Sequence, residues 1–265
     1  MIYLKTDEEV ELLRQANLLI DRTLAELAKL IKPGVTTLEL DRVAEEFIRD
    51  HGAEPVFKGF PNPGGHPFPA SICTSVNEQV VHGIPNSRPL EEGDIVSIDC
   101  GTRFNGFCGD SCYTFPVGEI SDDVRQFLVT TKQALYKGIE QAQAGHRIGD
   151  ISAAVQQHCE VHGYGVVREF VGHGVGRDMH EDPQVPNYGR RGTGPLLKNG
   201  LCIAIEPMIT MGTREVYMQE DRWGIITRDR KPAAHYEHSI CVRREGADIL
   251  SSFSEIEKVL GDKFI

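Results

Sequence analysis

The sequence lacks several features that would assign it to a class at once. No apolar run approaches the ~20 residues that a membrane-spanning helix needs, and the N-terminus contains no hydrophobic stretch of a secretion signal. The seven cysteines are odd in number, scattered, and include no C-x-x-C pair, which is typical of reduced thiols. We therefore expect a cytoplasmic protein without a membrane partner.

Positive charge is also scarce. The chain has 28 Lys and Arg residues against 39 Asp and Glu, which gives a net charge of -11. This balance argues against a nucleic-acid substrate, although the local pair Arg190-Arg191 could still touch one. With 265 residues, 40% hydrophobic and 25% charged, the chain has a globular composition, and its length fits one large domain or two fused halves.

What the sequence does contain is a hairpin that carries two acids, in residues 93–115. Asn105-Gly106 is the strongest short signal for a type I′ turn, and β-rich segments flank it. A two-residue loop at this point sets the register so that Asp110 faces Gly101, two residues from Asp99 on the same strand. The two carboxylates then share one face as diagonal neighbours, about 7 Å apart at the backbone.

Two ionised carboxylates that share a partly buried site repel each other, so one would keep its proton unless a cation compensated the charge. The alternative is that Asp99 and Asp110 are ordinary exposed acids near strand ends. The hairpin alone leaves both interpretations open, and the rest of the chain favours the cation.

Two helices are expected before the hairpin. A capping box at residues 6–9 begins an amphipathic run that should last to about Ile31. A second capping box, formed by Thr36 and Glu39, begins a helix that should end at Gly52.

The second half of the chain repeats the first. Residues 32–52 align with residues 143–163, with glycines and a histidine at matching positions. Matching acids recur in the strands of the two halves, Asp99 with Glu206 and Asp110 with Glu237. Long repeats of this kind usually pack about a pseudo-twofold axis, and the four acids would converge on it.

The order of these elements predicts an α+β fold, in which a repeat of helix pairs packs on the convex face of a curved, mostly antiparallel sheet. We expect residues 1–265 to form a single catalytic domain, with the repeat divided at roughly 1–118 and 119–265. The acids would lie on the concave face. Because aspartate and glutamate are almost never buried unpaired, four converging acids indicate a metal site.

A nitrogen ligand could come from residues 170–183, where glycines bracket His173 and His180 follows. The spacing matches neither H-E-x-x-H nor a dinucleotide or phosphate fingerprint, and no G-x-S-x-G elbow occurs. An isolated histidine is more often a hydrogen-bonded loop residue, and spacing alone leaves that alternative open. In the company of four acids, we interpret His173 as a ligand.

The segments SIDCG, GDSCYTF, GHGVG, IEPM and YEHS resemble the metal-binding motifs of type I methionine aminopeptidases, and the resemblance covers nearly the whole chain. The residues that match the five ligands of that family are Asp99, Asp110, His173, Glu206 and Glu237. The resemblance implies the pita-bread fold and two divalent metal ions. Carboxylate-rich ligation with one histidine suits cobalt, manganese, iron or zinc similarly, so the sequence does not select the metal.

The resemblance also implies a role for each ligand. Asp99 would bind one ion, His173 and Glu206 would belong mainly to the other, and two acids would bridge both. The two bridging residues would be Asp110 and Glu237.

Catalytic roles follow from the same resemblance. Glu206 matches the residue proposed as proton shuttle, and His82 and His180 match two histidines that contact the peptide and the scissile amide. The implied activity is removal of the initiator methionine from nascent chains and peptides whose second residue is small. The implied enzyme is a monomer with N-terminal Met peptides as substrates and a transient contact with the ribosome.

The side-chain pocket is where this sequence departs from the family. Common members have a tyrosine in the motif F-x-G-Y, whereas this chain has Phe60, and its Pro/Gly-rich loop within residues 57–69, with an insertion at 61–67, is longer. The candidates to line a thioether pocket are Cys73, Phe60, Phe68, Met179 and Trp223. The alternative is that Phe60 and Phe68 only anchor the loop.

Two other functions remain compatible with these motifs. Proline-specific aminopeptidases and prolidases would keep the same five ligands, but they carry a large additional N-terminal domain, and only 92 residues precede Gly93 here. A binding protein on the same scaffold could have lost catalysis. Such proteins typically lose ligands, and all five are present in this chain.

Overall fold

The computed structural model describes residues 1–62 and 65–265. The expected insertion at 61–67 therefore falls partly outside the described residues, at positions 63 and 64. The helices are α1 (Asp7–Ala28), α2 (Thr37–Asp50), α3 (Asp122–Ile139), α4 (Ile148–Glu160) and α5 (Ser254–Leu260), followed by a short 3₁₀ helix, η1 (Gly261–Lys263). None of the helices in these ranges is both long enough and apolar enough to cross a membrane.

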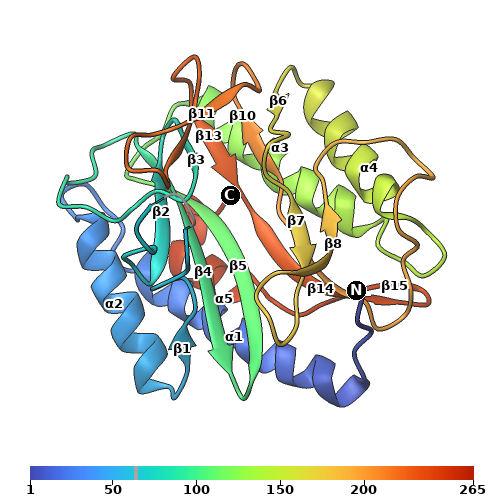
Figure 1. Cartoon of the computed structure of the whole chain (residues 1–265). Helices are drawn as coiled ribbons and strands as arrows, with labels where there is room; N and C mark the ends of the chain where they lie inside the picture. Colours follow the sequence, from blue (N-terminus) through green and yellow to red (C-terminus); the bar gives the residue numbers. More distant parts are fainter. Residues whose placement is uncertain (63–64) are drawn as a thin grey trace.

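A large antiparallel sheet forms the centre of the molecule (Figure 1). Its path runs through β1 (Glu54–Pro55), β4 (Ile95–Phe104), β5 (Phe107–Pro116), β14 (Glu237–Arg243), β9 (Cys202–Ile205), β7 (Gly172–Gly174) and β8 (Glu181–Val185). Two further strands extend it, β2 (Ile72–Val76) beside β4 and β15 (Gly246–Ile249) beside β14.

Two smaller antiparallel sheets lie at one end of the central one. The first consists of β13 (Ala233–His235), β10 (Met208–Thr210) and β6 (Gly165–Val166). The second consists of β11 (Val216–Met218), β12 (Ile225–Thr227) and β3 (Gln79–Val81).

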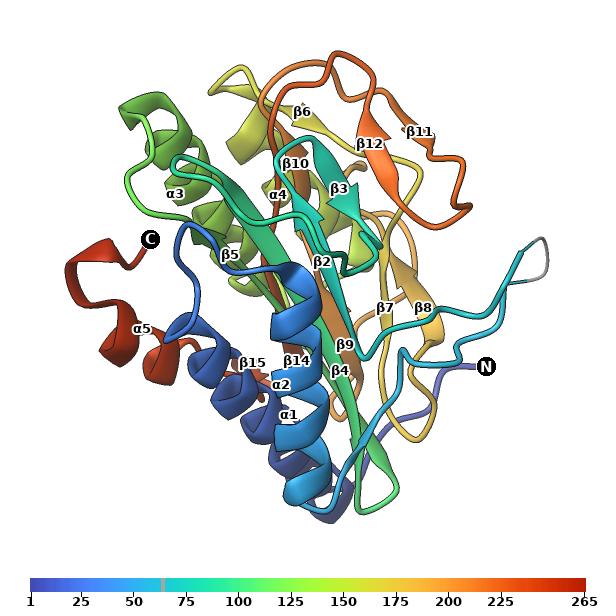
Figure 2. The ribbon, with the colours of Figure 1, turned by 90° about the vertical axis from the view of Figure 1, so that its left-hand side faces the viewer.

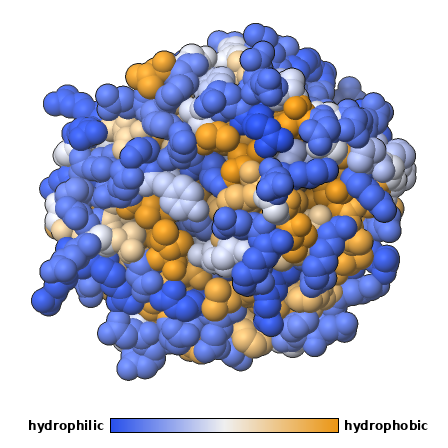
Figure 3. Space-filling model, turned by 180° about the vertical axis from the view of Figure 1, so that it is seen from behind, coloured by the Kyte–Doolittle hydropathy of each residue, from blue (hydrophilic) through white to orange (hydrophobic). Residues whose placement is uncertain are grey.

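Helices cover one face of the central sheet. Turned sideways, the molecule shows α1, α3 and α5 to the left of β4 and β5, with β7, β8 and β12 to the right (Figure 2). From behind, the surface is mostly hydrophilic, and charged and polar residues divide its hydrophobic patches (Figure 3). Most apolar residues of α1 and α3 are buried, as amphipathic helices on a sheet predict.

The predicted hairpin is confirmed in detail. β4 pairs with β5 so that Gly101 lies opposite Asp110, and Asp99 lies opposite Cys112. Asn105 and Gly106 both have positive φ, 50° and 80°, as a type I′ turn requires. The turn residues thus determine which acids share a face.

The first helix begins as expected and ends earlier than expected. Thr6 forms a complete capping box with Glu9, but α1 ends at Ala28, because the chain tightens into a turn before Pro33. Only half of the second box forms: the Thr36 hydroxyl accepts a bond from the Glu39 N–H, and the Glu39 carboxylate makes none of the hydrogen bonds found in the described part of the chain.

The repeat is visible in the backbone. The matched glycines before α2 and α4, Gly34 and Gly145, have φ of 96° and 97°. Gly93 and Gly200, which precede the matched strands β4 and β9, have φ of 88° and 87°. Such values favour glycine at each of these turns.

The two halves meet where β5 pairs with β14. The alignment that matches Asp110 with Glu237 also matches Ser111 with His238, and these two residues are direct cross-strand partners. A residue that pairs with its own equivalent lies on the axis relating the halves. The pseudo-twofold axis therefore passes beside both acids.

Close contact between α1 and β5 leads to a first prediction. A Cβ at Gly109 would lie 2.7 Å from the Ala16 carbonyl carbon and from the Asn17 nitrogen, which are backbone atoms of α1. We expect Gly109→Ala to lower the free energy of unfolding by about 1–3 kcal/mol. Thermal unfolding tests this, because a domain of this size should lose about 2–4 °C in Tm for each kcal/mol. An unchanged Tm would show that α1 moves away from β5 without cost.

Candidate metal centre and peptide pocket

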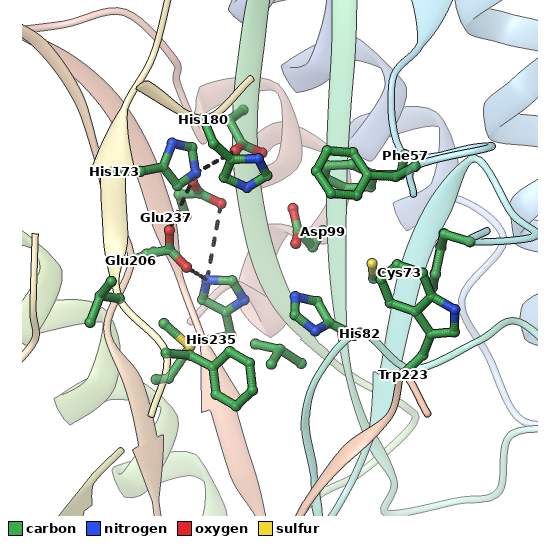
Figure 4. A pocket seen from close by; sticks show the side chains of 17 residues that line it. Phe57, Cys73, His82, Asp99, His173, His180, Glu206, Trp223, His235 and Glu237 are labelled. Atoms are coloured by element: carbon green, nitrogen blue, oxygen red, sulfur yellow. Dashed lines mark ion pairs between the residues drawn. The ribbon is translucent and has the colours of Figure 1, made fainter. Parts of the chain in front are cut away.

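A cavity of about 240 Å³ opens on the face of the sheet that the helices leave free. Its walls come from both halves of the chain and combine acids, histidines and apolar side chains. The lining residues are Phe57, Phe60, Phe68, Cys73, Val81, His82, Asp99, Asp110, Phe170, Val171, His173, His180, Glu206, Met208, Trp223, His235 and Glu237. In the close-up, His173, Glu206, His235 and Glu237 gather on one side and Phe57, Cys73 and Trp223 on the other, with Asp99 and His82 between them (Figure 4).

The structure brings the five predicted ligands together. Ligand atoms of Asp110, His173 and Glu237 lie within 4.8 Å of one another. Glu206 directly follows β9, and its Oε1 lies 3.6 Å from His173 Nε2. Asp99 completes the group from β4, two residues before the partner of Asp110.

The backbone of both central acids is tied across the repeat interface. The Ser111 hydroxyl donates to the carbonyl of Glu237, and the Ser239 hydroxyl donates to the carbonyl of Asp110, each at 2.9 Å. The Asp110 N–H donates to the Asn17 side chain of α1 at 3.2 Å. These bonds hold the two carboxylates in place without using their own oxygens.

His173 is held in one tautomer. Its Nδ1 lies 2.9 Å from the Gly174 carbonyl oxygen, which can only accept, so Nδ1 carries the proton. The unprotonated Nε2 then faces Asp110 Oδ2 at 3.3 Å and Glu206 Oε1 at 3.6 Å. A lone pair that faces two carboxylates is repelled by both, unless a cation lies between them.

The donor set fits a cation for a second reason. Asp99, Asp110 and Glu237 each have a buried side-chain oxygen without a hydrogen-bond partner. Burial raises the pKa of these carboxyls and of Glu206 well above the usual range, and repulsion from neighbouring acids adds to this for Asp99, Glu206 and Glu237. A divalent ion would satisfy these oxygens and offset the charge. The residues present therefore fit a metal site.

His235 lies in this site although the sequence interpretation missed it. Its Nε2 is buried without a hydrogen-bond partner, 3.6 Å from Glu206 Oε2 and 4.0 Å from Glu237 Oε2. Burial lowers its pKa to about 3, so the imidazole is neutral. The sequence feature that could have identified His235 is its position two residues before Glu237, because alternate residues of an extended chain share a face.

His82 and His180 reach the cavity from opposite sides. His82 follows β3 with a φ of 59°, and its ring lies edge-on to Phe170 at 5.4 Å. His180 precedes β8, and its ring centre lies 4.3 Å from that of His173. Burial is the main cause that lowers the pKa of both to about 4, so each imidazole is neutral near pH 7 and can donate one hydrogen bond.

Four of the five side chains predicted for the apolar pocket line the cavity. Phe60, Phe68, Cys73 and Trp223 line it, and the Phe68 and Trp223 rings pack edge to face at 5.1 Å. Met179 does not reach the cavity wall; it packs in a separate apolar cluster with Val10, Leu13 and Val175. Met179, which was predicted for the pocket, thus lies outside the residues that line this cavity, whereas its neighbour His180 lines it. Several wall residues were not predicted: Phe57, Val81, Phe170, Val171 and Met208.

Comparison with known proteins agrees with this arrangement. Residues 11–244 match the model of metallopeptidase family M24. The chain is 51% identical over 252 residues to a methionine aminopeptidase from Clostridium acetobutylicum, covering 95% of this chain and 99% of that relative.

Solved structures show the same fold. A crystal structure of methionine aminopeptidase from Rickettsia prowazekii superposes with a TM-score of 0.91 at 40% identity, covering 95% of this chain and 100% of that one. An Xaa-Pro dipeptidase from Bacillus anthracis gives a TM-score of 0.72 at 25% identity, covering 94% of this chain and 62% of that one. The predicted pita-bread fold is confirmed, and the chain belongs to metallopeptidase family M24 and, within it, to the methionine aminopeptidases.

Proposed function

We propose that this protein removes the N-terminal methionine from peptides and nascent chains whose second residue is small. The observation that carries the proposal is that one cavity combines two kinds of wall. Four acids and His173 form one of them, and aromatic side chains with Cys73 form the other. Such a pocket suits an unbranched thioether side chain, which packs well against aromatic edges and sulfur. The names of the similar proteins support the same activity.

We propose further that the cavity binds two divalent ions. Asp99 would hold one ion, His173 and Glu206 mainly the other, and Asp110 and Glu237 both; cobalt, manganese, iron and zinc all suit these donors. Bound divalent ions supply Lewis-acid chemistry, because they polarise a carbonyl group and lower the pKa of water.

The protein's own groups would perform the remaining steps. Glu206 takes a proton from the attacking water and returns it to the leaving amine. His180, which is neutral and lines the cavity, donates a hydrogen bond to the oxygen on which charge develops. His82 would contact the peptide from the opposite side, next to Phe170 and Trp223.

Four proposals concern the protein in the cell: a single catalytic unit, a monomer, a cytoplasmic location and a ribosome contact. Residues 1–265 would act as one catalytic unit, and a monomer would suffice, because a single chain supplies every wall of the cavity. All seven cysteines are free thiols, in keeping with a reducing cytoplasm. Nascent chains would reach the enzyme through a transient ribosome contact, which co-sedimentation with translating ribosomes tests.

The proposed activity is tested by release of free methionine from Met-Ala-Ser. We expect release to depend on an added divalent metal and to stop with a chelator. The matched substrate is an X-Pro dipeptide, which should not be cleaved. Preference for X-Pro would contradict the proposal and support a prolidase instead.

The second residue of the substrate should decide the rate. The α-amine and the scissile carbonyl must lie against the acids, so the second side chain is crowded against His82 and His180. We expect Met-Leu-Ser to be poorer than Met-Ala-Ser by at least about 10²-fold in kcat/KM, equivalent to ~3 kcal/mol. Similar kcat/KM values for the two peptides would contradict the steric argument but not the metal site.

A further inference from the structure

The segment that carries His180 is fastened by the N-terminal end of the chain. Residues 175–180 connect β7 to β8, and Glu181, the first residue of β8, directly follows His180. The N-terminal segment, residues 1–5, runs beside β8 (Figure 1), with a bridge between Ile2 and Asp182. Residues distant in sequence thus meet next to the cavity.

The contact that matters is a buried ion pair. Lys5 Nζ lies 2.5 Å from Glu181 Oε2, and the two side chains are only 5% and 9% exposed. Lysine and glutamate are rarely buried to this degree unless they are paired. Removal of one partner from such a pair leaves an uncompensated charge inside the protein, which strongly destabilises that arrangement.

Both partners are also anchored to the elements around them. The Lys5 N–H donates to the Gly200 carbonyl at 2.7 Å, at the turn that leads into β9. Glu181 Oε1 accepts from the Asp178 N–H at 3.4 Å, which closes the loop in front of His180. A Cβ at Gly176 would lie 2.2 Å from Glu181 Oε1 and 2.6 Å from Lys5 Cε, so the backbone packs tightly over the pair.

We propose that Lys5 and Glu181 are positioning residues that hold the His180 imidazole over the reacting carbonyl. This inference rests on the proposed function, since it assigns to His180 the hydrogen bond to substrate. Neither residue lines the cavity. Their effect passes through the backbone. The ion pair fixes the conformation of Glu181, and because Glu181 is joined to His180 by a peptide bond, it also fixes the direction of the His180 side chain.

The first variant is Lys5→Met, which keeps the length of the side chain and removes its charge. The unpaired Glu181 carboxylate should turn toward water and draw the 178–181 backbone with it. We expect kcat for Met-Ala-Ser to fall by about 10-fold to 10²-fold, because a displacement of ~1 Å is enough for such a loss. KM should change by less than about threefold, since the methionine pocket is untouched.

A double-mutant cycle decides whether Lys5 acts through His180. In a His180→Ala background, Lys5→Met should lower kcat by less than about twofold, because the group that it positions is gone. Full additivity of the two losses would overturn the proposal. So would a folded Lys5→Met variant with unchanged kcat.

A second readout does not depend on activity. Hydrogen exchange of the manganese-loaded full chain should show amides 178–182 exchanging at least about tenfold faster in Lys5→Met than in the wild type. Unchanged exchange there would overturn the positioning role. A wild type without aminopeptidase activity would instead contradict the proposed function, and the exchange result would still stand.

Two further variants serve as controls. Arg177 lies on the same loop as His180 and pairs with Glu9 of α1 at 3.3 Å, but its side chain is 67% exposed, and Arg177→Met breaks this pair. Exposed pairs contribute little, so kcat and exchange should stay within about twofold of wild type. If Lys5→Met does not fold, the double variant Lys5→Met/Glu181→Gln removes both charges of the pair, so stability should return. The value of kcat should stay low, and recovery of kcat would overturn the proposal.

Discussion

Replacement of Asp110 by asparagine, or of Glu237 by glutamine, should reduce turnover by at least about 10³-fold, equivalent to ~4 kcal/mol. Each change removes a negative charge and almost no volume. The two carboxylates lie beside the pseudo-twofold axis, and their ligand atoms and that of His173 lie within 4.8 Å. Loss of either charge would weaken the attraction for every ion in the cavity.

The measurement is kcat for Met-Ala-Ser at saturating manganese, together with the number of ions bound by calorimetry. Both variants should fold, because the backbones of Asp110 and Glu237 are held by Ser239 and Ser111 and not by their own carboxylates. Asp248→Asn is the matched control. Asp248 lies on β15, away from the cavity, and accepts hydrogen bonds from Arg14 of α1 and Arg243 of β14. The loss of its charge should leave kcat within about twofold of wild type. An Asp110→Asn variant with more than about a tenth of wild-type turnover at saturating metal would contradict a dinuclear site.

The second large effect is expected at His180. Its imidazole is neutral near pH 7, since burial lowers its pKa to about 4, so it can donate a hydrogen bond without first losing a proton. A donor aimed at developing charge acts mainly in the transition state. We therefore expect His180→Ala to lower kcat by about 10²-fold to 10³-fold, with a smaller change in KM.

Steady-state kinetics on Met-Ala-Ser separate the two parameters. Phe60→Leu is a useful comparison, because Phe60 packs edge-on to the His180 ring at 5.3 Å and also lines the apolar wall. That variant should change KM more than kcat, the reverse of His180→Ala. If the His180→Ala effect is confined to KM, the residue only positions substrate.

Local patterns were sufficient to predict the hairpin and its acids. Asn105-Gly106 imposes positive φ on both residues, so the register of β4 and β5 depends on two adjacent positions. The matched glycines of the repeat likewise act within single turns. For the same reason the common face of Asp99 and Asp110 could be predicted, because side chains alternate regularly along a strand.

The ligands outside the hairpin were predicted from the repeat and from resemblance to a family. No local pattern states how far His173 lies from Asp110, since β7 and β5 meet only through β9 and β14. The structure supplies that distance, 3.3 Å between His173 Nε2 and Asp110 Oδ2. It also shows which tautomer of His173 faces the acids.

The sequence by itself thus determined the hairpin, the common face of Asp99 and Asp110, the repeat of the two halves and the family. Only the tertiary structure decided which of two adjacent side chains enters the cavity: His180 does and Met179 does not, and His235 joins the acids from a separate strand. It also brought Lys5 to Glu181 across most of the chain. The physical reason is that local conformation follows from neighbouring residues, whereas the direction and pairing of these side chains follow from packing between segments far apart in sequence.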